Sequence, residues 1–310
     1  MIIIRYCGGL GNQMYQYALS CVLEELYPDQ TIKADTSHYE LLHEHNGFEL
    51  NEIFNLNIEI ASLQEVRAVY AGLLPNRLIA RLPYKCKKYI ICQFQYKYNK
   101  LKNFVYPQKK KNVIPGLEFN VFHDVVLHLH YRENYYFDGL WQNMKYFSGY
   151  ENKIASRFQF TAELSPEEQE RLKEIESRNS VAVHIRGGDF LGTKFDICQP
   201  AYYQKAIRMM EEQISDMKLF VFTDDVEYAE KILPFTKEKL VYSSSVGNNY
   251  LDMLFMSKCK HNIISNSTFS FWAAFLNRNP EKIVICPKYC LNDERGFHEF
   301  STPDNWMKIE

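Results

Sequence analysis

Short apolar runs alternate with longer amphipathic stretches along the chain, and the apolar runs are rich in isoleucine, valine and phenylalanine. Such runs predict buried strands, and the amphipathic stretches predict the helices that connect parallel strands. Residues 36–118 show no regular period, so the pattern predicts little there. In the remainder of the first half, we expect strands at 2–6, 31–35 and 134–142, and helices at 12–26 and near 145–158.

The second half follows the same alternation more regularly. Ser165, Pro166 and Glu168 form an N-terminal helix signal, because the serine and glutamate make a capping box and proline suits the first turn. Strands are expected at 180–185, 218–223, 239–244, 261–265 and 282–286, and helices at 200–214, 226–233, 249–258 and 269–278. The pattern of the second half predicts a doubly wound α/β domain. The length of the chain suggests about two domains, which we place at 1–155 and 156–310.

Length and composition narrow the class of protein. A chain of 310 residues buries roughly 75% of its unfolded surface, so it needs no disulfide or metal to fold. The N-terminal apolar run is too short for a signal peptide, and no stretch approaches the about 20 apolar residues of a membrane span. Eight scattered cysteines, with no C-x-x-C pair near histidine, argue against structural zinc and favour reduced thiols in the cytoplasm.

One segment, at about 65–118, differs from the rest in charge. No acidic residue lies between Glu65 and Glu118, whereas three arginines and nine lysines gather there among tyrosines and phenylalanines. Such a basic segment suits nucleic acid, an anionic membrane surface or an acidic lipid-linked substrate. The alternative is that the segment is a solvent-exposed, lysine-rich stretch without a binding role. Nucleic acid fits poorly, because the second half of the chain has the motifs of an enzyme.

Glycine-rich and polar clusters follow the predicted strands, where open α/β sheets bind ligands. The first cluster is GGLGNQ, from Gly8 to Gln13, between a strand and a helix. Its glycines let the backbone approach a ligand, and the helix N-terminus attracts anions. A dinucleotide fingerprint counted from Gly9 and Gly11 needs a third glycine at Met14, which disfavours a nicotinamide site. A purely structural tight turn is the alternative.

The second cluster is HIRGGD, in which His184, Arg186 and Asp189 surround two glycines at a strand end. Arg186 presents a guanidinium fork that suits a diphosphate. His184 is a candidate donor to a phosphate or base. Asp189 is a candidate either to accept a proton or to hold Arg186. A packed histidine and a polar turn are the ordinary alternatives.

The third cluster is FTDD, with Thr223, Asp224 and Asp225 at another strand end. Adjacent acids on an extended backbone point in opposite directions, so they make a poor pair of metal ligands. We expect one acid to cap the next helix and the other to lie near a ribose or base.

The fourth cluster is SNSTFSFWAA, where Asn266, Ser267 and Thr268 precede an aromatic helix. Its hydroxyls and backbone N–H groups suit a phosphate, although a well-capped helix explains the same residues. Upstream, Asp252 begins an apolar stripe and is a candidate helix cap or guanine contact. Several phosphate-competent turns, without a Walker lysine or a metal cluster, predict a nucleotide-diphosphate leaving group held by protein alone.

Three motifs, GGLGNQMYQYA, VHIRGGDF and SNSTFSFWAA, resemble in sequence and order those of the bacterial α-1,2-fucosyltransferases of glycosyltransferase family eleven. The likeness covers nearly the whole chain, including YFDGLWQ and the closing NWMKIE. It implies a GT-B fold with two Rossmann-like domains facing a cleft. It also implies inverting, metal-independent transfer of L-fucose from GDP-β-L-fucose to the 2-hydroxyl of a terminal galactose. One departure is Gly187, where the family usually has arginine or leucine, so Arg186 acts alone or with backbone help.

The resemblance also implies roles for individual residues. Arg186 and the helix start near Thr268 would stabilise the leaving diphosphate. Asp189 is the first candidate for the base and Asn12 an orienting partner, which makes Asp189, Arg186 and Asn12 the catalytic candidates. Trp141 and Gln142, with the basic segment, are expected on the acceptor side. The expected donor-site residues are Gly9, Gly11, Asn12, His184, Arg186, Thr223, Asp224, Asp252, Asn266, Ser267 and Thr268.

For the whole protein we expect no cofactor or metal and no nucleic-acid partner. The expected substrates are GDP-fucose and a glycan that ends in galactose. A lipid-linked glycan is one form of this acceptor. The expected location is the cytoplasm, with peripheral contact at the inner membrane face through the basic segment. The alternatives are a fucosyltransferase of another linkage, a non-catalytic module that binds a sugar nucleotide or glycan, and a nicotinamide-dependent oxidoreductase.

Overall fold

A computed structural model describes the chain at 1–42, 45–70, 112–116, 121–130, 133–233, 239–242 and 248–310. The chain divides into two compact units, Met1–Arg157 (unit 1) and Phe158–Glu310 (unit 2), whereas the sequence placed the division between 155 and 156. Most of the basic segment lies outside the described residues, so its predicted membrane or substrate contact stays a prediction.

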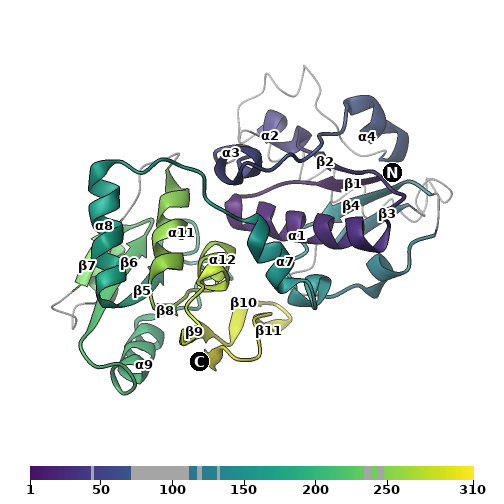
Figure 1. Ribbon diagram of the computed structural model, residues 1–310. Helices are drawn as coiled ribbons and strands as arrows, with labels where there is room; N and C mark the ends of the chain where they lie inside the picture. The colour runs from purple at the N-terminus through teal and green to yellow at the C-terminus, as the bar shows by residue number, and fades with distance from the viewer. Residues whose placement is uncertain (43–44, 71–111, 117–120, 131–132, 234–238, 243–247) are drawn as a thin grey trace. The chain divides into compact units, whose positions relative to one another are not determined.

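Within the described residues, unit 1 is built on a parallel sheet with the strand order β2-β1-β4-β3 (Figure 1). Its strands are β1 (Ile2–Arg5), β2 (Ile32–Asp35), β3 (Val113–Gly116) and β4 (Tyr135–Gly139). Its helices are α1 (Leu10–Leu26), α2 (Ser37–Leu42), α3 (Leu50–Phe54), α4 (Leu63–Val69) and α7 (Glu151–Arg157), with 3-10 turns η1 (Asp124–Leu127) and η2 (Met144–Phe147). The expected strands and the first helix are present, while β3 and the short helices within 36–118 lie where the sequence shows no period.

The two central strands of unit 1, β1 and β4, are buried on both faces. Ile2, Ile3 and Ile4 are fully buried, which explains why this strand is a continuous apolar run rather than an alternating one. On one face, Ile3 packs with Val66 of α4 and Tyr136 of β4. Helix α1 also belongs to the core of unit 1. Its residues from Leu10 to Leu23 are all buried except Asn12.

The order of the strands places a topological switch point in unit 1. The chain leaves β1 through α1 toward β2 on one side, whereas β4 pairs with β1 on the other side. The segments that follow β1 and β4 therefore diverge, which leaves room for a ligand at their carboxyl ends. Gln16 of α1 bridges these ends, because its Oε1 accepts from Cys7 N at 3.1 Å and its Nε2 donates to Gly139 O at 3.2 Å.

Unit 2 holds a larger parallel sheet with the order β12-β9-β8-β5-β6-β7. Its strands are β5 (Asn179–Ile185), β6 (Met217–Thr223), β7 (Lys239–Tyr242), β8 (His261–Ile263), β9 (Val284–Pro287) and β12 (Met307–Ile309). Its helices are α8 (Pro166–Ser177), α9 (Pro200–Glu211), α10 (Val226–Ile232), α11 (Asn249–Lys258) and α12 (Thr268–Leu276), and β10 (Tyr289–Asp293) and β11 (Gly296–Glu299) form an antiparallel hairpin. Every element expected after residue 165 is present, with ends shifted by a few residues, and the capping box of Ser165 and Glu168 is confirmed.

Alternate residues of β5 serve two different layers. Val181 and Val183 pack with Tyr203 and Ile207 of α9, on the face that α10 also covers. His184 lies on the opposite face, where its ring is 5.9 Å from that of Phe269 in α12. Helices α8 and α11 also cover this opposite face (Figure 1). Unit 2 is therefore a doubly wound α/β domain, as the sequence predicted.

Unit 2 has its own switch point, between β5 and β8. The chain passes from β5 to β6 and β7 on one side, then crosses back through α11 to β8 on the other side. The loop after β5 leads to α9 on one face of the sheet, and the loop after β8 leads to α12 on the other. Sheets of this topology bind nucleotides in the crevice at the carboxyl ends of the strands beside the switch point, here β5, β6 and β8.

The α/β class with two Rossmann-like units is thus confirmed. Within the described ranges, no helix has both the length and the apolar character needed to cross a membrane. None of the six cysteines in those ranges takes part in a disulfide bond.

Candidate functional site

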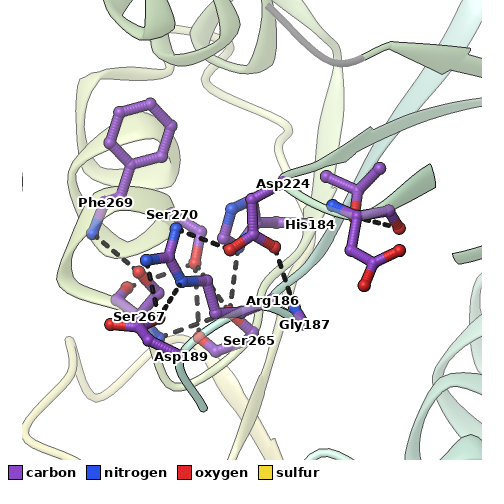
Figure 2. A network of polar contacts seen from close by, with 11 residues as sticks. His184, Arg186, Gly187, Asp189, Asp224, Ser265, Ser267, Phe269 and Ser270 are labelled. Carbon is purple, nitrogen blue, oxygen red and sulfur yellow. Dashed lines mark hydrogen bonds and ion pairs between the residues drawn. The ribbon is translucent and has the colours of Figure 1, made fainter. Parts of the chain in front are cut away.

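Arg186 follows the last residue of β5 and lies between two carboxylates (Figure 2). Its Nε and Nη2 donate to Asp189 Oδ1 at 3.1 and 2.8 Å, and its Nη1 lies 3.0 Å from Asp224 Oδ2. The side chain of Arg186 is 28% exposed. The guanidinium is therefore held in one orientation while part of it stays open to an anion.

Asp224 also shapes the turn that follows Arg186. Its Oδ1 accepts the backbone N–H of Gly187 at 2.8 Å. Gly188 has a positive φ of 38°, and a Cβ at this position would lie 2.5 Å from Asp224 Oδ2. Only glycine fits there, because any side chain would both strain the backbone and displace the carboxylate.

The two adjacent acids after β6 divide their roles. Asp225 is the N-cap of α10, since its Oδ1 accepts the backbone N–H of Tyr228 at 2.9 Å. Thr223 braces this turn through its hydroxyl, which accepts from Asp225 N and donates to Asp225 O. The prediction that one acid caps the helix is confirmed. The other acid, Asp224, contacts Arg186 and Gly187, and its expected place near a ribose or base stays a prediction.

Gly187 departs from the pattern of the family that the sequence resembles, and the structure shows a local reason. A Cβ at Gly187 would lie 3.0 Å from both Asp225 Cβ and Tyr228 Cδ1. The α10 cap and Tyr228 thus occupy the space that a larger residue at 187 needs. The expectation that Arg186 and the neighbouring backbone contact a diphosphate stays a prediction.

His184 is a buried, neutral member of the cluster. Its Nδ1 lies 2.9 Å from Ser265 Oγ, so the end of β5 is joined to the loop that follows β8. Burial, and then the charge of Arg186, lower the pKa of His184 to about 3. An imidazole with this pKa offers hydrogen bonds but no positive charge near neutral pH.

The loop between β8 and α12 is held by its own hydroxyls. Ser267 is the N-cap of α12, since its Oγ accepts the backbone N–H of Phe269, and Thr268 is the first helical residue. Ser270 donates to the backbone carbonyl groups of Ser265 and Ser267. The predicted capped helix is confirmed, and its N-terminus lies at the same crevice as His184.

The side chain of Asn266 is bonded to neighbouring loops. Its Nδ2 donates to Phe195 O at 3.0 Å and to Cys290 O at 2.7 Å, and its Oδ1 accepts from the Cys198 thiol. Both amide hydrogens are thus used by protein groups, in a side chain that is 7% exposed. Asn266 therefore anchors this loop to two others, and its expected place in the donor site stays a prediction.

Asp252 lies in the first turn of α11 and is 7% exposed. The N-cap of that helix is Asn248, so the alternative in which Asp252 caps the helix is wrong. Its proposed contact with guanine stays a prediction.

A second cluster lies at the switch point of unit 1. Gly8 has a positive φ of 79°, Gly9 is the N-cap of α1, and Gly11 is buried in its first turn. Gln142 Nε2 donates to Asn12 Oδ1 at 2.7 Å, so two residues that the sequence assigned to different substrates lie side by side. Gly9, Gly11 and Asn12 therefore belong to a cluster of unit 1, whereas Arg186 belongs to unit 2.

Trp141, which the sequence analysis expected on the acceptor side, has a buried side chain. Its ring is 2% exposed and packs 5.3 Å from the Phe137 ring and 5.4 Å from the Tyr146 ring. Gly116 makes room for it, since a Cβ there would lie 2.6 Å from the indole. Trp141 therefore cannot offer its face to a sugar. Its positive φ of 57° turns the chain after β4 and brings Gln142 to Asn12.

The sequence analysis missed the loop at 45–49. Gln13 Nε2 donates to Gly47 O at 2.8 Å and to Gly8 O at 3.2 Å, and its Oε1 accepts from Glu49 N at 3.0 Å. This one buried amide joins the loop to the glycine turn. The signal was available, because Gln13 ends the motif GGLGNQ and a buried glutamine requires hydrogen-bond partners.

The described residues contain no group of three or more histidine, cysteine, aspartate or glutamate side chains that could hold a metal ion. Asp224 and Asp225 are already engaged by Arg186, Gly187 and the start of α10.

The chain folds into two Rossmann-like units, and its sequence is that of a glycosyltransferase. The chain belongs to glycosyltransferase family 11, whose family model matches residues 1–310. It is 29% identical over 317 residues to an alpha-1,2-colitosyltransferase of Escherichia coli, covering 100% of this chain and 99% of that protein.

It is also 30% identical over 318 residues to the O-antigen biosynthesis glycosyltransferase WbnK of Escherichia coli, covering 97% of this chain and 98% of that protein. Among solved structures, it is similar to the NodZ alpha-1,6-fucosyltransferase from a crystal soaked with GDP-fucose. That likeness has a TM-score of 0.48 and 14% identity, and it covers 97% of this chain and 99% of the other.

Proposed function

We propose that this glycosyltransferase transfers L-fucose from GDP-β-L-fucose to the 2-hydroxyl of a terminal galactose, with inversion at the anomeric carbon. The observation that carries the proposal is Arg186, held by Asp189 and Asp224 at the switch point of unit 2 with one side exposed. Membership of family 11 and the resemblance of the three motifs to α-1,2-fucosyltransferases support the choice of sugar and linkage.

Donor cleavage places negative charge on the diphosphate and positive charge on the anomeric carbon. Arg186 would contact the diphosphate, and the N-terminus of α12 near Thr268 would add backbone N–H donors. Both groups are oriented before the donor binds, so little reorganisation accompanies the reaction. His184 would donate a hydrogen bond as a neutral imidazole, with Ser265 fixing its ring.

On the acceptor side, Asn12 and Gln142 would orient the hydroxyl that attacks. Asp189 is the candidate base from the sequence, and it has 64% of its side chain exposed. Its Oδ1 accepts from Arg186, which supports the alternative that it braces the guanidinium. An Asp189→Asn variant that loses more turnover than donor affinity would support the base role, whereas equal losses would support bracing.

We propose that the transfer requires no metal or other cofactor. The support is that Arg186 and the α12 backbone can neutralise a diphosphate, while the two acids after β6 already have protein partners. Turnover in excess chelator should equal turnover without it. Loss of activity that added Mg²⁺ or Mn²⁺ restores would refute metal independence.

A second candidate donor is the GDP derivative of colitose. The observation that favours it is the alpha-1,2-colitosyltransferase that is 29% identical along the whole chain. Colitose lacks the 3-hydroxyl of fucose, so the two donors differ by one polar group. A site that hydrogen-bonds this hydroxyl would strongly prefer fucose, because the bond is lost with colitose.

The decisive experiment incubates the protein with GDP-fucose or GDP-colitose and a panel of galactosides, and determines the product linkage by NMR. The expected product carries α-1,2-linked fucose, and a product formed only from GDP-colitose would assign the second candidate. Arg186→Ala should lower both GDP affinity and turnover by at least about 100-fold, given about 3 kcal/mol for a buried charge contact. Arg208→Ala, an exposed arginine of α9, is the matched control and should leave both unchanged.

A non-catalytic binding module would behave differently in the same experiment. It would bind GDP-fucose yet form no product with any galactoside, and Asp189→Asn would leave its affinity intact. If the protein does not bind NADH, the alternative of a nicotinamide-dependent oxidoreductase is excluded.

We further propose a lipid-linked O-antigen or capsule intermediate as the acceptor, reached from the cytoplasmic face of the membrane. The printed name of the WbnK relative and the basic composition between Glu65 and Glu118 support this. Flotation with anionic vesicles, but not with zwitterionic vesicles, is the expected result, and no flotation with either would refute membrane contact.

A further inference from the structure

The loop at 45–49 is fastened onto the glycine turn of unit 1. Gln13 is fully buried, and its amide makes three hydrogen bonds that join Gly8 to Gly47 and Glu49. Tyr39 of α2 adds a fourth contact, since its hydroxyl donates to Gly8 O at 2.7 Å. These hydrogen bonds therefore hold the loop in place beside the switch point of unit 1.

His45 begins this loop and lies against the glycine turn. If Gly9 carried a Cβ, that atom would be 3.4 Å from His45 Nδ1 and 3.6 Å from its Cε1 and Cγ, so the imidazole lies over the bare backbone of Gly9. His45 has a positive φ of 52°, a conformation that costs energy for a residue with a side chain. Its side chain is exposed to solvent, so a substrate can reach it.

The switch point of unit 1 thus gathers three polar side chains around one turn. Asn12 and Gln142 are bonded to each other, and His45 lies on the residue that begins the same helix. An amide can orient a hydroxyl but cannot take its proton, whereas an imidazole can do so near neutral pH. The cluster around Arg186 offers Asp189, which would give up its contact with Arg186 on taking a proton.

We propose that His45 is the general base that deprotonates the acceptor hydroxyl, an inference that rests on the proposed transferase function. A ring nitrogen of His45 takes the hydroxyl proton as the oxygen bonds to the anomeric carbon of the donor. The bond from that carbon to the diphosphate oxygen breaks, and its electron pair leaves with GDP. The imidazolium then returns the proton to solvent, so no further reactant is needed.

The elements around this turn differ in their titratable groups. The first turn of α1 has no acidic residue, whereas α2 carries His38, Tyr39 and Glu40. Glu49, the N-cap residue of α3, is 6% exposed. Among the residues that the structure describes, none makes a hydrogen bond to its Oε2. Burial raises the pKa of Glu49 above its ordinary value. Glu49 is therefore a rival base, besides Asp189, that an experiment must separate from His45.

The test compares His45→Asn with Glu49→Gln and with His128→Asn. Asparagine tolerates the left-handed backbone at position 45 but cannot act as a base, and His128 is an exposed histidine of the same unit. We expect His45→Asn to lower kcat about 10²- to 10⁴-fold, the usual contribution of a general base. GDP affinity should stay within about twofold, since GDP is assigned to unit 2, and this also shows that the variant is folded.

The pH dependence of kcat/KM supplies the decisive readout. In the wild type, the value should fall on the acidic side as the base is protonated, and this limb should disappear in the residual activity of His45→Asn. His128→Asn should keep both the rate and the limb. If His45→Asn keeps the limb or loses less than about threefold in kcat, or if only Glu49→Gln removes the limb, His45 is not the base. A wild-type protein that transfers no sugar would instead refute the proposed function.

Discussion

Asp224 contacts both the guanidinium of Arg186 and the backbone amide of Gly187, so one carboxylate fixes the charge and the shape of the same turn. Asp189 holds the guanidinium from the other side. The partners of Arg186 are acids that a diphosphate would approach closely. At the scale of single residues, the site is therefore pre-organised at some electrostatic cost, which the positive end of α12 reduces.

Gly188 offers a test of that pre-organisation. Gly188→Ala introduces a Cβ 2.5 Å from Asp224 Oδ2 and should push the carboxylate away from Arg186. We expect weaker GDP binding in isothermal titration, besides a backbone cost of about 1–2 kcal/mol. Gly192→Ala is the matched control, because Gly192 has a φ of 69° but nothing within 4 Å of a new Cβ. Equal losses of GDP affinity in both variants would contradict the role of Asp224.

His184 makes a prediction for stability against pH. Its pKa is about 3 in the folded protein against an ordinary value of 6.5, so the unfolded chain binds the proton first. The stability that follows from the neutral ring is complete above about pH 6.5 and is lost as the pH falls toward 3. Between pH 7 and pH 5, this one group should remove about 2 kcal/mol from the free energy of unfolding.

Urea unfolding at the two pH values measures this loss. His184→Gln should show a pH-dependent loss that is about 2 kcal/mol smaller than in the wild type, because glutamine does not titrate. An identical loss in both proteins would show that His184 does not titrate on unfolding as described.

At the scale of elements, two helices of unit 2 begin with a serine cap but differ in surroundings. Ser165 caps α8 within a capping box, and Ser267 caps α12 at the crevice of the switch point. The same local chemistry therefore serves a plain surface helix and a helix whose N-terminus meets the candidate donor site.

The two caps predict separable effects. Ser165→Ala and Ser267→Ala should each lower the free energy of unfolding by about 1 kcal/mol, because each leaves backbone N–H groups unsatisfied. Only Ser267→Ala should also weaken GDP binding. Denaturant unfolding and GDP titration of both variants check this, and an unchanged GDP affinity in Ser267→Ala would place the diphosphate elsewhere.

Elements with a strong period were predictable, and short irregular ones were not. Helix α11 begins and ends at the expected residues, and the strands of unit 2 before residue 287 lie within a few residues of their expected places. The hairpin of β10 and β11 and the short strand β12 were missed. These pieces pair through backbone bonds to partners that local sequence does not specify, so no periodic signal marks them.

At the scale of the whole molecule, the same topological device occurs twice. Each unit has a parallel sheet whose strand order reverses beside its central strand, and a polar cluster lies at each reversal. We expect the two clusters to serve different substrates, the donor in unit 2 and the acceptor in unit 1.

Hydrogen exchange with bound GDP tests this division. Protection by GDP should be largest at 184–190, 223–228 and 265–270, because these loops contain the candidate diphosphate contacts. Backbone amides at 8–13 should be protected less by GDP alone. Greater protection at the glycine turn than at the loop after β5 would assign the nucleotide to unit 1 and contradict the division.

The sequence by itself determined the α/β class, the two-domain organisation and the motifs around Arg186 and Asn12, because periodicity and glycine turns are local properties of the chain. Only the tertiary structure decided which polar groups are available to a ligand. The side-chain amide of Asn266 donates to the carbonyl groups of Phe195 and Cys290, and Asp224 forms an ion pair with Arg186. The side chain of Trp141 is buried. The physical reason is that a hydrogen bond or a burial needs a partner that is distant in sequence, and only folding brings that partner into contact.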